Sequence, residues 1–159
     1  MPKMNIPVIF KPLVEVFQAI DGQGQLWSPS GQFLGLLSSN SNDPNSILNT
    51  QGSYGSPFSL KSIHNPQGLY GGSAGMYSPF NLNCLNPPII LYQRQPILVV
   101  TSNLNVFTNG LKSVDPYLML TIYEELGNTS SKPVAMPSQS ANKSQRPNPQ
   151  VLKDMLALV

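Results

Sequence analysis

One serine lies in a glycine-rich motif of the kind in which hydrolases place a nucleophile. Residues 71–75 read GGSAG and match G-x-S-x-G, in which a tight turn exposes the serine to substrate. In that arrangement the motif joins a strand to a helix, and the catalytic histidine follows it. The only histidine here, His64, precedes Ser73, and no strand-then-helix pattern surrounds the motif. A triad of another topology would need His64 with Asp43 or Asp115. We therefore predict a non-enzymatic protein in which Ser73 fills a glycine loop.

A metal or cofactor site has few candidate residues. The single histidine, the single cysteine and the scattered carboxylates do not follow the spacing of a metal site, and phosphate-binding glycine motifs are absent. We predict no metal and no cofactor. Cys84 cannot form an intrachain disulfide, and we interpret it as a small buried hydrophobic residue.

Aromatic residues could instead bind a ligand by stacking. An aromatic ring offers a flat apolar face, and tyrosine and tryptophan add a polar group at the edge. For Trp27, the only tryptophan, we favour a core anchor beside a hairpin turn over a role in ligand stacking. The candidate stacking residues for a carbohydrate are Trp27, Tyr54, Tyr70 and Tyr77.

Most of these residues belong to a repeat with a period of sixteen residues. Residues 45–56 and 61–72 share seven identities, and a truncated third unit is visible at Ser78 and Asn81. Asparagine side chains can bond to nearby backbone and glycines can adopt positive φ, so we expect ordered loops. The expected contacts are Ile47 with Tyr54 and Ile63 with Tyr70, and the expected positive-φ glycines are Gly52, Gly55, Gly68 and Gly71.

The repeat resembles an uncharacterised bacterial module, common in cyanobacteria, whose members carry S-I-x-N-P-x-G-x-Y-G-S units between short glycine-containing β-hairpins. The resemblance covers residues 26–103. The chain departs from the pattern at Thr50, where proline is usual, and at residues 72–76. The resemblance implies a module that occurs alone or is appended to secreted hydrolases, and hence an accessory role.

Two short hairpins are predicted on either side of the repeat. The first joins strands 25–28 and 32–38. The second joins strands 89–92 and 97–101 through the turn residues 93–96. A lone hairpin is marginal in water, so we expect both to join one small sheet over which the loops are draped.

Helices are predicted before and after this sheet. The apolar residues of 7–20 fit either a strand or a helix behind Pro12, and Gly22 ends the element in both cases. Asp115 caps a second helix, which we expect to end at Gly127. Alternation within residues 118–123 leaves a strand as the alternative.

The C-terminal region changes composition. Residues 127–147 are rich in Ser, Asn, Gln, Pro and Lys, and we predict a disordered linker. A short amphipathic helix is predicted at 148–159, with Asn148 as its cap. Its apolar stripe docks either on its own domain or in a partner's groove. The residues of the stripe are Val151, Leu152, Met155, Leu156 and Val159.

The composition bounds the class of protein. With 159 residues, 40% of them hydrophobic, the chain is long enough for one domain. Only 10% of residues are charged, against about 25% in an average protein. The cations are too sparse for nucleic-acid binding, and no apolar run reaches the length of a membrane span. The start of the chain lacks a signal-peptide pattern, so a cytoplasmic location is our default expectation, whereas the resemblance implies export.

These observations predict a mainly β fold with one short helix in the domain. The expected parts are a β-rich domain at 1–126, the linker at 127–147 and the terminal helix at 148–159. We predict a structural or adaptor protein that attaches to a protein partner through its tail and terminal helix. The alternative is an accessory module that binds carbohydrate or peptidoglycan.

Overall fold

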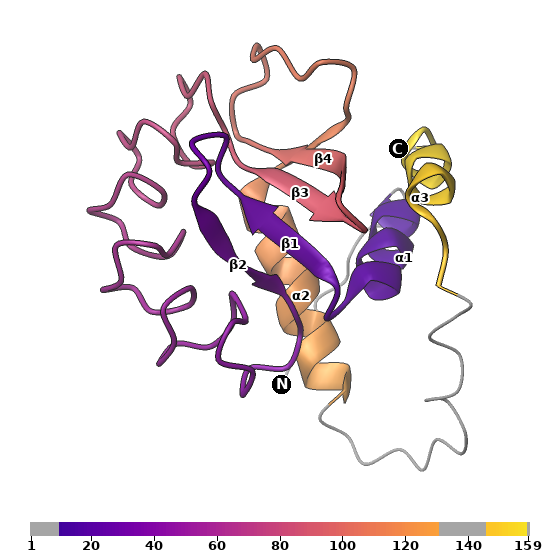
Figure 1. The fold of residues 1–159 in the computed structure, drawn as a ribbon, viewed down its shortest axis with the longest axis horizontal. Helices are drawn as coiled ribbons and strands as arrows, with labels where there is room; N and C mark the ends of the chain where they lie inside the picture. Colours follow the sequence, from indigo (N-terminus) through magenta and orange to yellow (C-terminus); the bar gives the residue numbers. More distant parts are fainter. Residues whose placement is uncertain (1–9, 131–145, 159) are drawn as a thin grey trace.

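The computed structural model describes residues 10–130 and 146–158, which form one five-stranded sheet and three helices (Figure 1). Among these residues the helices hold more of the chain than the strands, so the fold is mixed rather than mainly β. The helices are α1 (Lys11–Ile20), α2 (Pro116–Ser130) and α3 (Pro149–Leu156), and the strands are β1 (Gly24–Trp27), β2 (Phe33–Leu37), β3 (Ile89–Tyr92), β4 (Gln95–Val100) and β5 (Ser113–Val114).

The sheet has the strand order β2-β1-β3-β4-β5. Antiparallel pairing joins β1 to β2, β1 to β3 and β3 to β4, so segments from before and after the repeat lie side by side. The turn between β3 and β4 is shorter than predicted, because Tyr92 pairs with Gln95 and only Gln93 and Arg94 lie between them. The two-residue strand β5 pairs in parallel with β4, and the sequence analysis did not predict it.

Helix α1 resolves the choice left open for its segment. It has proline in its first turn, and Gly22 follows it with φ +81°. Helix α2 begins where predicted, since the carboxylate of Asp115 accepts the backbone N–H of Tyr117 at 2.8 Å. The prediction that Gly127 ends this helix is wrong. A Cβ at Gly127 would lie 2.8 Å from the carbonyl oxygen of Ser39, so the glycine lets the continuing helix pass close to that loop.

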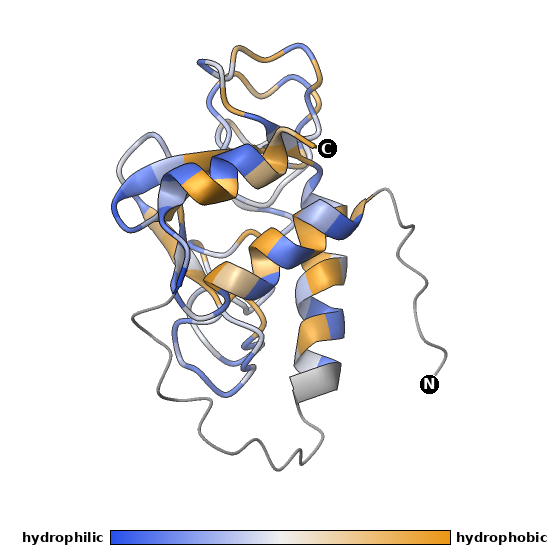
Figure 2. Ribbon diagram, turned by 90° about the vertical axis from the view of Figure 1, so that its right-hand side faces the viewer, coloured by the Kyte–Doolittle hydropathy of each residue, from blue (hydrophilic) through white to orange (hydrophobic). Residues whose placement is uncertain are grey.

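The three helices share one hydrophobic core with one face of the sheet. In Figure 1, α2 passes behind the sheet, and none of the described helices lies in front of it. Figure 2 shows α1 and α3 side by side, each with hydrophobic and hydrophilic residues mixed along it. The fully buried residues of this core include Val16, Phe17, Ile20, Leu26, Leu34, Leu37, Ile47, Ile90, Leu98, Val100, Met119, Ile122, Tyr123 and Leu152.

The repeat folds into a continuous coil of tight turns, seen as the series of loops beside β2 (Figure 1). Backbone N–H groups donate to the carbonyl three residues earlier at almost every step, and a four-residue step occurs once in each sixteen. Four steps of three and one step of four make up the period. The donors are Ser46, Asn49, Gly52, Ser56, Ser59, Ser62, Asn65, Gly68, Gly72, Gly75, Ser78, Asn81 and Cys84.

Side chains fix this coil by the same bonds in all three units. The buried hydroxyls of Ser46, Ser62 and Ser78 each accept the N–H two residues later, at 3.0 to 3.1 Å. Three asparagines at the next conserved position of the unit each donate to the carbonyl six residues earlier and accept the N–H two residues later. These are Asn49, Asn65 and Asn81.

The glycines of the repeat have a different role from the one predicted. The glycines with positive φ in the described residues are Gly22, Gly31, Gly35 and Gly110, and none lies in the repeat. A Cβ at Gly71 would instead lie 2.5 Å from the carbonyl oxygen of Asn65. Close approach of turn to turn, and not backbone conformation, therefore requires glycine there.

Candidate functional site

The three residues that a triad of another topology would need are engaged in structural hydrogen bonds. The Nε2 of His64 lies 2.7 Å from the carbonyl oxygen of Ile47, and because a carbonyl only accepts, Nε2 carries the proton. The pKa of His64 is lowered, mainly because the ring is buried. The hydrogen bond to Ile47 and the charge of Glu124 act in the opposite direction and are smaller. The carboxylate of Asp115 caps α2, and that of Asp43 accepts the N–H of Asn45 at 2.8 Å.

The structure also places the serine of the G-x-S-x-G motif and the single cysteine. Ser73 is exposed on its loop. Cys84 is buried, its Sγ lies 3.2 Å from the carbonyl oxygen of Met76, and burial raises the pKa of its thiol. Within residues 10–130 and 146–158, no group of three or more His, Cys, Asp or Glu side chains could hold a metal ion.

The terminal helix α3 docks on its own domain. Leu152 and Leu156 are buried in the core, and Met155 packs against it. Of the residues predicted to bind a partner, Val151 has 43% of its surface exposed and Val159 lies outside the described residues. Of the two docking alternatives, the structure has the one in which the domain itself covers the stripe, so Leu152 and Leu156 are not exposed to a partner.

Polar contacts hold the segment that leads into α3. The hydroxyl of Tyr92 donates to the carbonyl oxygen of Pro147 at 2.8 Å. The guanidinium of Arg146 lies 3.3 Å from the carbonyl oxygens of Ala19 and Asp21, at the C-terminal end of α1. Asn148 caps α3 by accepting the N–H of Val151 at 2.9 Å, as predicted. The predicted linker lies largely in residues 131–145, outside the described part of the chain.

The predicted stacking residues fall into two groups. Tyr70 and Tyr77 stack on each other, with ring centroids 5.9 Å apart. Tyr54 packs edge-on against Phe33 at 4.9 Å, and Phe33 in turn contacts Trp27 at 5.2 Å. Trp27 is not part of the hydrophobic core, so the core-anchor interpretation is wrong. Strand alternation puts Leu26 on the core face of β1 and Trp27 on the open face.

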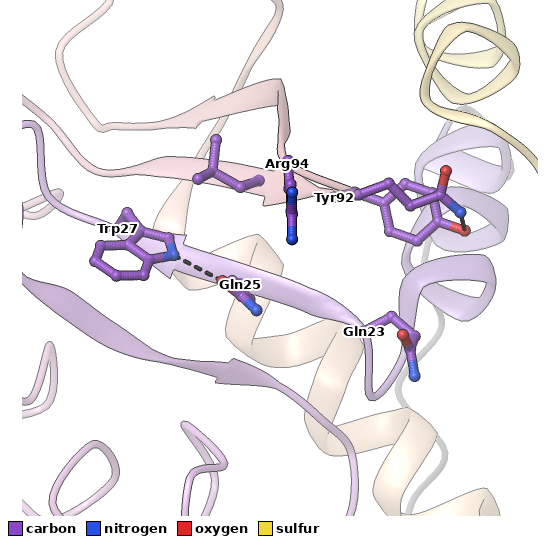
Figure 3. Close-up of a pocket in the computed structure, with 7 residues that line it drawn as sticks. Gln23, Gln25, Trp27, Tyr92 and Arg94 are labelled. Carbon is purple, nitrogen blue, oxygen red and sulfur yellow. Dashed lines mark hydrogen bonds between the residues drawn. The ribbon is translucent and has the colours of Figure 1, made fainter.

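A hollow of about 390 Å³ lies on the open face of the sheet beside Trp27 (Figure 3). Its size falls in the range of small-molecule sites, roughly 300 to 1,000 Å³. Its lining residues include the apolar side chains of Trp27 and Leu91 and the amide side chains of three glutamines. The lining residues are Gln23, Gln25, Trp27, Leu91, Tyr92, Gln93 and Arg94.

The register of the sheet brings these residues together. Gln25 and Trp27 are two residues apart on β1 and therefore share a face, and Gln25 pairs with Leu91 on β3. The indole Nε1 of Trp27 donates to Oε1 of Gln25 at 2.9 Å, which restrains the plane of the ring and leaves the amide Nε2 of Gln25 outside this bond. Figure 3 shows Arg94 projecting over the sheet from the β3–β4 turn, between Trp27 and Gln23.

Sequence reasoning found Trp27 and missed Gln23, Gln25 and Arg94. The alternation of Gln25, Leu26 and Trp27 was the available signal, since it places the amide beside the indole. Arg94 could not be found this way because it comes from a strand pair more than sixty residues later in the chain.

No family model, no curated protein and no solved structure matches this chain significantly. The function must therefore be inferred from the site. In the described residues, no helix is long and apolar enough to cross a membrane.

Proposed function

We propose that this protein is a non-catalytic module that binds carbohydrate through the open face of its sheet. The observation that carries the proposal is the hollow lined by the ring of Trp27, by the amide of Gln25 bonded to that ring, and by the amide of Gln23 at the opposite end. The C–H face of a pyranose is apolar and flat enough to cover an indole ring. The hydroxyls at its rim need both donors and acceptors, which an amide side chain supplies.

Preorganisation supports the same proposal. The bond between Trp27 and Gln25 and the contact of Trp27 with Phe33 hold the indole in place before a ligand arrives. A fixed aromatic platform loses little side-chain entropy on binding. The hollow also opens to solvent, so a long saccharide bound there by its end or its middle could extend out of it.

The test uses Trp27 as its own reporter, because it is the only tryptophan in the chain. A soluble glycan that covers the indole should change the emission of the protein in a saturable manner. Screening neutral and acidic oligosaccharides on a glycan array would supply the ligands for titration. The proposal would be contradicted if none of these glycans bound the protein at millimolar glycan concentration.

Two variants make the result specific. Trp27→Ala should abolish binding measured by calorimetry while leaving the melting temperature close to that of the parent, because the indole lies outside the core. Phe107→Ala is the matched control, since it removes an aromatic ring that is 86% exposed on another loop. If Trp27→Ala and Phe107→Ala bound the glycan with equal affinity, the ligand would not bind at Trp27.

The adaptor function remains a second candidate, supported by apolar side chains on the coil of turns. Leu60 and Met76 are equivalent positions of the repeat and are 78% and 60% exposed, and Leu69 and Leu85 are equivalent and are 53% and 75% exposed. Contiguous exposed apolar patches are typical of protein contact sites, and the repeat puts these side chains at matching positions of successive units. A pull-down that recovers the same partner with the parent and with Trp27→Ala, but not with Leu60→Ser plus Met76→Ser, would favour this candidate.

A further inference from the structure

We propose that the hollow beside Trp27 selects sugars that carry a carboxylate, and that Arg94 binds this group. The inference rests on the proposed carbohydrate function and names its ligand class. It starts from charge, because among the described residues Arg94 is the only charged one that lines the hollow. The other lining residues are amides, a tyrosine and apolar side chains, so a bound anion meets no opposing carboxylate.

The guanidinium of Arg94 is unengaged within the described part of the chain. None of the hydrogen bonds and ion pairs found among residues 10–130 and 146–158 involves its side chain. It lies over the sheet between Trp27 and Gln23 (Figure 3). An arginine offers a planar fork of donors that matches a carboxylate with two parallel hydrogen bonds.

The backbone at Arg94 is unfavourable for any residue other than glycine or asparagine. Gln93 and Arg94 form the two-residue turn between β3 and β4 with φ of 51° and 67°. Such turns strongly favour the pair Asn-Gly. Unfavourable backbone conformations often occur where a side chain is held for binding. The turn thus holds an arginine at a position that stability alone would give to glycine.

The chemistry favours a carboxylate over a phosphate. Phosphate sites combine several donors, such as a helix N-terminus, a nest of backbone N–H groups or clustered cations. This hollow offers one guanidinium beside neutral amides. A single arginine next to an aromatic platform suits a monoanion attached to a sugar ring. Uronic acids and the lactyl-substituted amino sugar of peptidoglycan both have this chemistry.

The experiment titrates the full chain with matched sugars and follows the fluorescence of Trp27. Trigalacturonic acid differs from its methyl ester by the charge and a methyl group at each carboxyl, and N-acetylmuramic acid differs from N-acetylglucosamine by the lactyl ether group that carries the carboxylate. The acid of at least one pair should bind about tenfold more tightly than its neutral counterpart at low salt, because the charged hydrogen bonds are lost in the neutral sugar. The preference should shrink when sodium chloride is raised from about 0.05 to about 0.5 M. Which pair shows the preference identifies the source of the ligand.

Variants separate the failure of this inference from the failure of the proposed function. Arg94→Gln should bind acid and neutral sugar equally well while keeping the neutral affinity, and Arg94→Lys should recover part of the preference. Lys61→Gln, which removes a charge from an exposed loop position, should behave as the parent. Equal affinity of the parent for acid and ester, tighter binding of a sugar phosphate, or an unchanged preference in Arg94→Gln would overturn the carboxylate assignment alone. Absence of binding to every sugar would overturn the proposed function itself.

Discussion

The side-chain amide of Asn65 donates a hydrogen bond of 3.0 Å to the carbonyl oxygen of Ser59, six residues earlier. Its Oδ1 accepts the N–H of Gln67, also at 3.0 Å. Asn65 is buried, so these bonds replace water for three polar groups at once. The same two bonds at Asn49 and Asn81 make this residue the main side-chain support of the coil of turns.

Asn65→Ala should therefore destabilise the protein. The variant leaves the Gln67 N–H without its acceptor and the Ser59 carbonyl with the N–H of Ser62 as its remaining donor, and we expect a loss of about 2 kcal/mol in the free energy of unfolding. Asn83→Ala, at an exposed position of the same coil, should change it by less than about 0.5 kcal/mol. Urea denaturation of the three proteins checks this. Equal losses in both variants would mean that the Asn65 bonds do not support the coil.

Comparing Gly71→Ala with Gly68→Ala tests whether the repeat needs glycine because neighbouring turns lie too close for a Cβ, or because of the backbone conformation. At Gly71 a Cβ would lie 2.5 Å from the Asn65 carbonyl oxygen, a backbone atom that cannot move freely, whereas at Gly68 its nearest neighbour would be a side-chain atom at 3.4 Å. We expect a loss of more than about 2 kcal/mol for Gly71→Ala. For Gly68→Ala we expect a change of less than about 1 kcal/mol. Similar melting temperatures for the two variants would contradict the close approach.

Leu152→Ala should lower the free energy of unfolding by about 3 kcal/mol, because it removes a fully buried leucine from the core. Val151→Ala changes the neighbouring, partly exposed residue of the same helix and should cost less than about 1 kcal/mol. Thermal unfolding of the two variants measures the difference. A Leu152→Ala protein as stable as the parent would show that α3 is not part of the core in solution.

The pKa of His64 predicts a dependence of stability on pH. Burial lowers this pKa, so between the folded value and the unfolded value of about 6.5 the unfolded state binds more protons. The free energy of unfolding should then fall as the pH is lowered through about 6.5, and rise in the opposite direction. In His64→Gln, whose amide can donate to the Ile47 carbonyl, this part of the dependence should disappear. Denaturant curves at pH values of about 7.5 and 5.5 test it, and parallel losses in both proteins would exclude His64 as the cause.

Arg94→Gly should stabilise the protein while removing its preference for acidic sugars. Glycine adopts positive φ without the steric cost that a side chain meets, so the variant should gain up to about 1 kcal/mol in the free energy of unfolding. Asn109, another non-glycine residue with positive φ, lies outside the hollow, and Asn109→Gly should change stability without changing binding. A lower melting temperature for Arg94→Gly would show that the arginine supports the turn.

The local structure was predictable wherever near neighbours in sequence decide it. Asp115 and Asn148 cap their helices because a short polar side chain reaches the N–H groups of the next turn. The bonds of Ser62 and Asn65 to backbone two residues later are local in the same sense. Residue type and spacing alone therefore indicated ordered turns, two strand pairs and an amphipathic end.

Contacts between distant segments decided the rest. The helix has a glycine at position 127 because it passes close to Ser39 there. Trp27 lies on the open face because the helices cover the other one, and Leu152 is buried because α1 lies beside α3. The hollow likewise exists only because β1 pairs with β3, which brings Gln25 to the turn that holds Arg94. The sequence by itself determined the local hydrogen bonding, which acts over a few residues. Only the tertiary structure decided what each surface faces, because burial and close approach depend on segments that are far apart in the chain.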